Sequence, residues 1–188
     1  RPGVVREGGM QCGRARRGDT KRHVTSITKS NAQGYGRVLW DRALDAVAAE
    51  FPDITTDSRL VDAAAMNFIR RPSTFDVVVA SNLFGDILSD VSAILTGSIG
   101  LAASANLDPT RRFPSMFEPV HGSAPDIAGR GVVNPMAQIL SGGMMLDHLG
   151  LGEAGRQVER AGAEVLGHGK VRTPDLGGAG SKTGVTEA

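Results

Sequence analysis

Two aspartates four positions apart, Asp86 and Asp90, are the strongest candidates for chemistry in this sequence. They follow an apolar run at residues 75–79 that is typical of a strand buried on both faces. If a helix begins after that strand, residues four apart share one helix face, so both carboxylates point the same way. Two carboxylates about 6 Å apart repel by roughly 3 kcal/mol at an effective dielectric of about 20.

The aspartate pair therefore predicts a bound cation if it lies in a cleft. Oxygen ligands with no His or Cys nearby favour Mg²⁺ or Mn²⁺ over zinc. The alternative is a solvent-exposed helix face that binds nothing, since acid pairs with this spacing are common on surfaces.

Lys29 and Asp62 are predicted at comparable positions. Lys29 follows residues 23–28, which are β-branched and alternate in polarity as strands do, and Asp62 lies in the apolar first turn of a predicted helix. Ligands of α/β sheets gather at the carboxyl ends of the strands, where a lysine beside carboxylates could move a proton or hold an oxyanion. The alternatives are an ordinary exposed lysine and an acid that only favours the helix dipole.

A glycine-rich loop at residues 121–131 is a candidate for binding phosphate, because glycines allow backbone N–H groups to approach a ligand closely. The chain contains no G-x-G-x-x-G, so the ordinary Rossmann fingerprint is absent. Residues 177–183 imitate a P-loop, but Ser181 stands where glycine should precede the lysine, and we expect no helix after it. A P-loop is therefore rejected.

Alternating strands and helices must position these residues, which indicates an α/β fold with a parallel sheet. Residues 82–85 are interpreted as the turn after the third strand, Ser58 as a helix cap, and the chain after Thr173 as lacking any element. The composition changes after Thr96, so we expect a basic arm at residues 1–22 and domains at 23–96 and 97–188. The predicted strands are 23–28, 54–57, 75–79 and 115–120, and the predicted helices are 36–50, 59–70, one from about residue 86, 135–149 and 153–166.

The composition is that of an ordinary soluble protein of 188 residues, with 40% hydrophobic and 22% charged residues. A net charge of +1 argues against a dedicated nucleic-acid binder, and the arm at residues 1–22, which we expect to be disordered, has no interleaved aromatics. The single cysteine, Cys12, cannot form an internal disulfide, so a reducing, cytoplasmic location is expected. No membrane span or signal-peptide pattern is present in the sequence.

Four long motifs resemble the β-decarboxylating dehydrogenases, the family of isopropylmalate, isocitrate and tartrate/D-malate dehydrogenases. Their order and separation also agree with that family. Residues 28–31 and 104–116 are most similar to the tartrate/D-malate branch. The matching motifs are TSITKSN at 25–31, VDAAAM at 61–66, SNLFGDILSD at 81–90 and EPVHGSAPDIAG at 118–129.

The resemblance implies the C-terminal half of an isopropylmalate-dehydrogenase-like fold, with two α/β subdomains and a non-Rossmann dinucleotide site. It implies that Asp86 and Asp90 bind Mg²⁺ or Mn²⁺, that Asp62 of a partner subunit completes the site, and that Lys29 of the partner transfers a proton. K⁺ is a further candidate ion. The residues implied to hold NAD are His121, Gly122, Ser123, Ala124, Asp126, Ile127 and Asn134.

Asp126 would accept hydrogen bonds from the adenosine ribose, and a carboxylate there repels a 2′-phosphate, which favours NAD over NADP. The implied reaction is oxidation of a (2R)-hydroxy acid such as tartrate or D-malate, with or without decarboxylation, by a homodimer. The alternatives are a 3-isopropylmalate dehydrogenase and a non-catalytic dimerising or nucleotide-binding remnant. Family members carry substrate-binding arginines and a tyrosine in a preceding half, so we expect a truncated enzyme that is poorly active alone.

Overall fold

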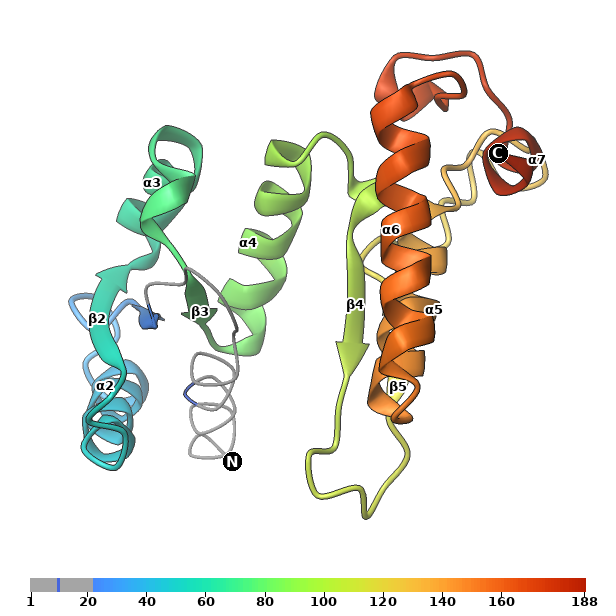
Figure 1. The fold of residues 1–188 in the computed structure, drawn as a ribbon. Coiled ribbons are helices and arrows are strands. Elements are labelled where there is room, and N and C mark those ends of the chain that lie inside the picture. The colour runs from blue at the N-terminus through green and yellow to red at the C-terminus, as the bar shows by residue number, and fades with distance from the viewer. Residues whose placement is uncertain (1–9, 11–21) are drawn as a thin grey trace. The chain divides into compact units, whose positions relative to one another are not determined.

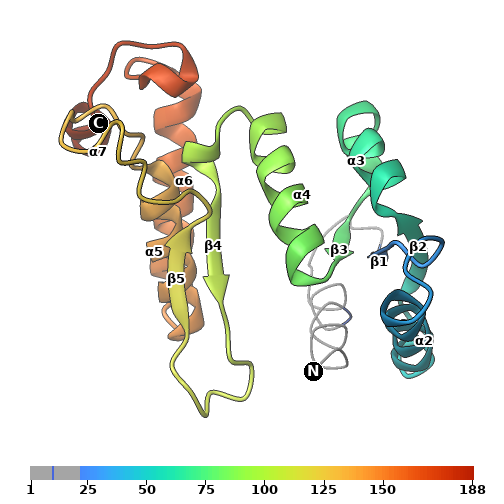
Figure 2. The same cartoon turned by 180° about the vertical axis from the view of Figure 1, so that it is seen from behind.

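The computed structural model describes Met10 and residues 22–188, and they divide between Val91 and Ser92 into two compact units (Figures 1 and 2). The predicted basic arm, residues 1–22, lies almost wholly outside the described residues.

The first unit is built on a parallel sheet of three described strands in the order β2-β1-β3. Helix α2 packs on one face of the central strand, and α3 and α4 pack on the other. The predicted parallel sheet is thus confirmed. The central strand β1 is buried on both faces, the valine strand β3 is buried on one face and half-buried on the other, and β2 has no buried residue. Its elements are β1 (His23–Thr28), α2 (Gly36–Ala48), β2 (Thr55–Leu60), α3 (Val61–Arg70), the 3-10 turn η1 (Pro72–Thr74), β3 (Val77–Val79) and α4 (Asn82–Leu95).

Alternation along β1 explains why it is covered on both faces. Val24 packs into a cluster with Trp40 and Leu44 of α2, whereas Ile27 packs into a second cluster with Phe68 of α3. On the same face of β1 as Val24, the buried indole Nε1 of Trp40 donates a hydrogen bond to Ser26 Oγ over 2.8 Å.

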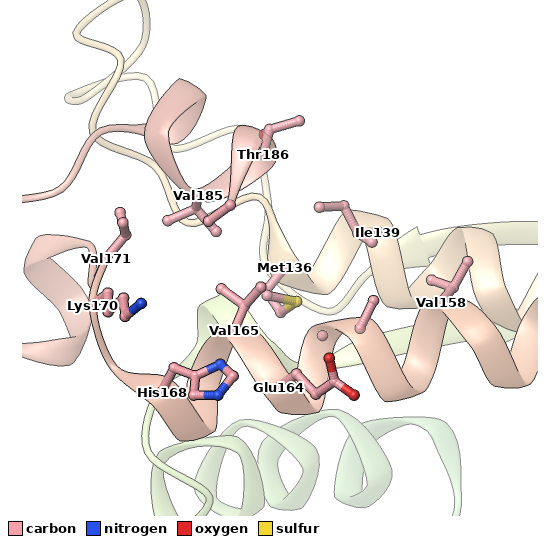
Figure 3. Close-up of a pocket in the computed structure, with 13 residues that line it drawn as sticks. Met136, Ile139, Val158, Glu164, Val165, His168, Lys170, Val171, Val185 and Thr186 are labelled. Carbon is pink, nitrogen blue, oxygen red and sulfur yellow. The ribbon is translucent and has the colours of Figure 1, made fainter.

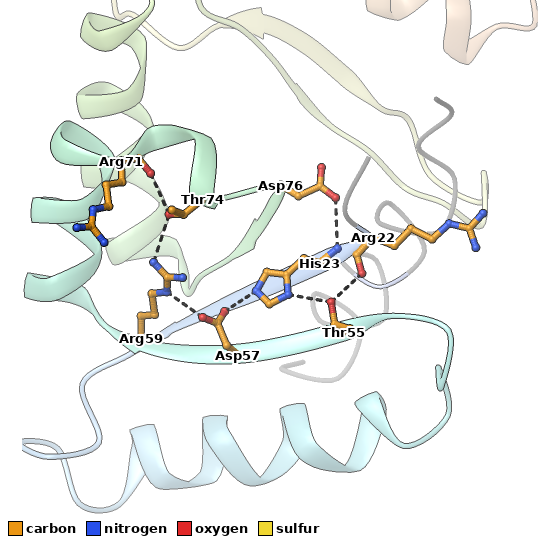
Figure 4. Close-up of polar contacts among 8 residues, drawn as sticks. All are labelled: Arg22, His23, Thr55, Asp57, Arg59, Arg71, Thr74 and Asp76. Atoms are coloured by element: carbon orange, nitrogen blue, oxygen red, sulfur yellow. Dashed lines mark hydrogen bonds and ion pairs between the residues drawn. The ribbon is translucent and has the colours of Figure 1, made fainter. Parts of the chain in front are cut away.

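A polar network joins β1 to β2 on the sheet (Figure 4). Asp57 Oδ1 lies 2.9 Å from His23 Nε2, and Arg59 Nε donates to Asp57 Oδ2 over 2.8 Å. Burial alone would raise the pKa of Asp57, but the hydrogen bonds from Arg59 and His23 help to outweigh it, and that pKa is lowered. The carboxylate of Asp57 therefore stays ionised and holds the two strands together.

Two predicted local boundaries are wrong. Ser58 does not cap a helix, because it lies inside β2 opposite Ser26, and α3 begins at Val61 after Leu60. Residues 82–85 do not form a turn, because α4 already begins at Asn82 and Gly85 N donates to Ser81 O over 2.8 Å. Strand pairing overrides the cap preference of serine, and a helix tolerates one glycine at a cost of about 1 kcal/mol.

The apolar face predicted for α4 is only partly buried. Leu88 is 3% exposed, whereas Ile87 is 53% and Ile94 65% exposed. This helix therefore presents apolar side chains that the described part of the chain does not cover.

The second unit contains an antiparallel strand pair and two long packed helices. The carbonyl oxygen of Gly143 on α5 lies 2.8 Å from where a Cβ on Gly155 of α6 would be, so these helix backbones need glycine to approach each other. Its elements are η2 (Ile99–Leu101), β4 (Ala103–Asn106), β5 (Met116–Pro119), α5 (Met136–His148), α6 (Gly152–His168), η3 (Pro174–Leu176) and α7 (Lys182–Glu187).

Sequence analysis missed β4, and the expectation that nothing regular follows Thr173 is wrong. Helix α7 begins at Lys182, where the Ser181 hydroxyl accepts a hydrogen bond from Gly184 N over 3.1 Å. A helix of six residues is too short for its sequence to show a clear helical period of apolar residues. In the described residues no helix has the length and apolar character that crossing a membrane requires.

Candidate active site

Lys29 and Asp62 are in contact at the carboxyl edge of the sheet. The two strands that precede them pair in register, with Thr28 opposite Leu60, so the chain leaves both strands at the same level. Lys29 Nζ donates to Asp62 Oδ1 over 2.8 Å. The hydrogen bond from Lys29 is the main cause that lowers the pKa of Asp62, whose side chain is 61% exposed.

Asp86 and Asp90 lie on α4, the helix that follows β3. Both are exposed, and no described residue forms an ion pair with either of them. For one chain this is the solvent-exposed helix face given above as the alternative to a cleft. Two carboxylates without a described counter-charge still have the oxygen ligands that suit a hard divalent ion. Among the described residues of one chain, no three acidic, His or Cys groups converge on a metal position, so Asp62 does not join this pair within the chain.

Arg37 is a residue of this region that sequence analysis missed. Its Nη1 donates to Ser81 Oγ over 2.6 Å, and its guanidinium carbon lies 4.2 Å from the centre of the Phe84 ring. Ser81 directly precedes α4 and Phe84 lies in its first turn. Arg37 therefore fixes the start of the helix that carries the two aspartates, and no local sequence signal shows this contact.

In the second unit, the glycine-rich loop encloses a pocket of about 240 Å³. An ideal Cβ at Gly122 would meet nothing within 4 Å, so the fold itself does not require glycine there and the space remains open to a ligand. Ala124 has a φ of 41°, a left-handed conformation that costs about 1 kcal/mol or more and is typical of ligand-binding loops. The lining residues are His121, Gly122, Ser123, Ala124, Ile127, Ala128, Gly129, Gly131, Val133 and Lys182.

Five of the seven predicted cofactor residues line this loop pocket, and Asp126 and Asn134 do not. Asn134 is instead buried, where its Oδ1 accepts from Met136 N and its Nδ2 donates to Asp175 Oδ2, both over 3.0 Å. Asp126 is exposed beside the pocket lining. A volume of about 240 Å³ is below the usual range for drug-sized ligands, so the pocket suits part of a dinucleotide.

Asp175 is the centre of a polar cluster that sequence analysis also missed. Ser98 Oγ donates to Asp175 Oδ2 over 2.5 Å, to the same oxygen that Asn134 contacts. Burial alone would raise the pKa of Asp175, but the hydrogen bonds from Ser98 and Asn134 help to outweigh it, and that pKa is lowered. A Cβ on Gly100 would lie 2.7 Å from Asn134 Cβ, so glycine is required there.

A larger pocket of about 440 Å³ lies among α5, α6 and the C-terminal segment (Figure 3). Most of its lining is apolar, with Glu164, His168 and Lys170 as its ionisable residues. None of the predicted site residues lies there.

Comparison with known proteins decides the family. A family model described as isocitrate/isopropylmalate dehydrogenase matches residues 6–188. The chain belongs to this family. It is 50% identical over 165 residues to a probable tartrate dehydrogenase/decarboxylase of Bacillus subtilis, which covers 88% of this chain and 46% of that protein.

Other members of the isocitrate/isopropylmalate dehydrogenase family are similarly close. A 3-isopropylmalate dehydrogenase of Frankia casuarinae is 54% identical over 146 residues, covering 78% of this chain and 43% of the relative. The crystal structure of isocitrate dehydrogenase from Methylococcus capsulatus superposes with a TM-score of 0.90 at 41% identity, over 98% of this chain and 54% of that one. The predicted fold is thereby confirmed, and the chain spans about half the length of these relatives.

Proposed function

We propose that this chain carries the metal-binding, proton-transfer and cofactor residues of a NAD- and divalent-metal-dependent dehydrogenase acting on a (2R)-hydroxy acid such as tartrate or D-malate. The observation that carries the proposal is the position of Lys29, Asp62 and helix α4. They follow three adjacent parallel strands, and the ligands of such sheets gather at that edge. Membership of the family supports dehydrogenation as the reaction class.

In this proposal Lys29 is the proton-transfer residue. Its ammonium group is held by Asp62 at 2.8 Å and its side chain is 26% exposed, so it has both a fixed position and access to a substrate. Asp86 and Asp90 would hold the divalent ion through their carboxylate oxygens. Bound Mg²⁺ or Mn²⁺ would stabilise negative charge on the substrate oxygen, and NAD would accept the hydride.

We propose that two copies of the chain share each metal site. Among the described residues of one chain, no third acidic, His or Cys group joins Asp86 and Asp90, and a second copy would supply the Lys29–Asp62 pair. The apolar face of α4 supports such an association, because Ile87 and Ile94 are more than half exposed. A helix face of this kind is stabilised when another chain covers it.

The substrate proposal follows the tartrate/D-malate motifs and the Bacillus subtilis relative. The second candidate is 3-isopropylmalate, which the Frankia casuarinae relative supports with 54% identity over a shorter stretch. A remnant that binds a nucleotide without turnover is the candidate from outside the enzymes.

Steady-state formation of NADH by the purified 188-residue chain with Mn²⁺ tests these alternatives. We expect slow turnover of D-malate or tartrate that exceeds turnover of 3-isopropylmalate and is abolished by Asp86→Asn. Asp45→Asn, which removes an exposed carboxylate of α2, is the matched control and should leave the rate unchanged. A preference for 3-isopropylmalate would reject the substrate proposal. If calorimetry detects binding of neither Mn²⁺ nor NAD, the proposal that this chain carries a dehydrogenase site is rejected.

A further inference from the structure

Lys182 lines the loop pocket although it lies about fifty positions beyond the loop in the sequence. Its backbone N–H donates to Gly131 O over 2.8 Å, which joins the start of α7 to the end of the loop. Figures 1 and 2 show α7 beside this loop in both views. This backbone hydrogen bond holds Lys182 at the edge of the pocket, where the residue is exposed.

Among the described residues, the ionisable ones that line the loop pocket are Lys182 and His121, and none of the lining residues carries a carboxylate. No ion pair with a described residue engages the ammonium group of Lys182. The His121 ring donates from Nδ1 to Gly122 O over 3.0 Å, because a carbonyl oxygen can only accept. A glycine-rich lining with one lysine and no described carboxylate is suited to an anion.

The tail around Lys182 is still not a P-loop. One ground for rejecting that motif is removed, because helix α7 does follow Lys182. The other ground remains, and the element before the tail is the 3-10 turn η3 rather than a strand. The lysine can act on the loop pocket without the motif, since the pocket's open floor is formed by the 121–131 loop.

We propose that Lys182 is a phosphate-binding residue of the loop pocket, and that this pocket accepts one phosphate group of the dinucleotide. The proposal rests on the proposed function for the identity of the nucleotide. It bears on cofactor choice, because Asp126, the ground for expecting NAD, is not among the lining residues, whereas a cation is. An ammonium group attracts a 2′-phosphate as readily as it attracts the pyrophosphate.

Equilibrium binding of small adenine ligands to the full 188-residue chain tests this assignment. The probes are 5′-AMP, 2′-AMP and the uncharged adenosine, each titrated by calorimetry at low and at high salt. Lys182→Gln should weaken binding of at least one of the two phosphates about tenfold or more, because a charge-assisted hydrogen bond is lost. Binding of adenosine should not change, and high salt should reduce the difference between the proteins.

The controls separate charge from folding. Lys170→Gln removes a lysine that lines the other pocket of the same unit and should leave both phosphates unaffected. Lys182→Arg should restore most of the affinity. Thermal unfolding should be the same for Lys182→Gln and the unchanged chain, because the contact to Gly131 is made by the backbone.

Each outcome of the titrations decides the assignment. A loss confined to 2′-AMP supports a phosphate on the ribose, and a loss confined to 5′-AMP supports the pyrophosphate. Equal losses for adenosine and the phosphates, or no loss at all, would overturn the role of Lys182. If Lys182→Gln weakens phosphate binding while no substrate is oxidised, the phosphate site stands and the proposed dehydrogenase fails. If substrate is oxidised while phosphate affinity is unchanged, the dehydrogenase stands and the role of Lys182 fails.

Discussion

Replacing Asp90 by asparagine should have two effects of opposite sign on stability. Without metal, the change removes repulsion between two exposed carboxylates on one helix face, which costs about 0.2–0.5 kcal/mol for like charges at this spacing. The variant should therefore unfold about 0.4–2 °C higher than the unchanged chain, since about 1 kcal/mol corresponds to about 2–4 °C at this size.

With Mn²⁺, the sign should reverse. An ion at about one hundred times its dissociation constant stabilises the folded chain by about 2.7 kcal/mol, which corresponds to a rise of about 5–11 °C. Asp90→Asn removes one of the two charged ligands that α4 supplies and should lose most of that rise. The unchanged chain should thus become the more stable protein once Mn²⁺ is present.

The assay is thermal unfolding followed by circular dichroism, with and without Mn²⁺, at several protein concentrations. The Mn²⁺-dependent rise should increase with protein concentration if two copies share the ion. Asp45→Asn is the matched control and should keep the full rise. The reasoning is refuted if Asp90→Asn keeps the rise, or if Asp45→Asn loses it equally.

Three further measurements test the fold and the lysine contact. Leu88→Ala should lower the free energy of unfolding, measured in urea, by about 2–5 kcal/mol because Leu88 is buried. Ile87→Ala should act mainly on self-association, since Ile87 is exposed. Equal losses of unfolding free energy for the two variants in a monomer would contradict this. Lys29→Met should raise the pKa of Asp62 toward its ordinary value in an NMR titration, and an unchanged pKa would contradict the contact. Because its folded-state pKa is lowered, Asp57 stabilises the chain above about pH 4, and this contribution is lost as the pH falls through that pKa. In Asp57→Asn the free energy of unfolding, measured in urea, should therefore fall less steeply as the pH is lowered.

The parallel sheet could be predicted because its signals are local. Three consecutive valines predict a strand covered on both sides. Val77 and Val79 are buried in one cluster, and Val78 packs, half-buried, against the other. The position of Lys29 beside Asp62 also follows from topology, since the ends of neighbouring parallel strands meet at one edge. Strand pairing itself is not local, which explains why β2 extends through Ser58.

The remaining features depend on contacts between distant segments. The period of α4 shows which side chains share a face but does not show whether this chain covers them, and Ile94 is exposed. Arg37 contacts Ser81 across 44 positions, and Asp175 contacts Ser98 across 77. Neither the composition nor the residue spacing near Lys182 indicates that this residue lines the pocket of the 121–131 loop. Such partners are found only when the chain is folded.

The order of the sheet leaves β3 as an outer strand among the described residues. Its far side therefore presents the main-chain N–H and C=O groups of three valines, a short ladder of donors and acceptors with no described strand opposite. The other outer strand, β2, carries Asp57 and Arg59, and such charges discourage pairing with a foreign strand. Concentrated solutions of this chain should therefore aggregate through the valine edge, and a lysine in place of Val78, which is half-buried, should delay that aggregation.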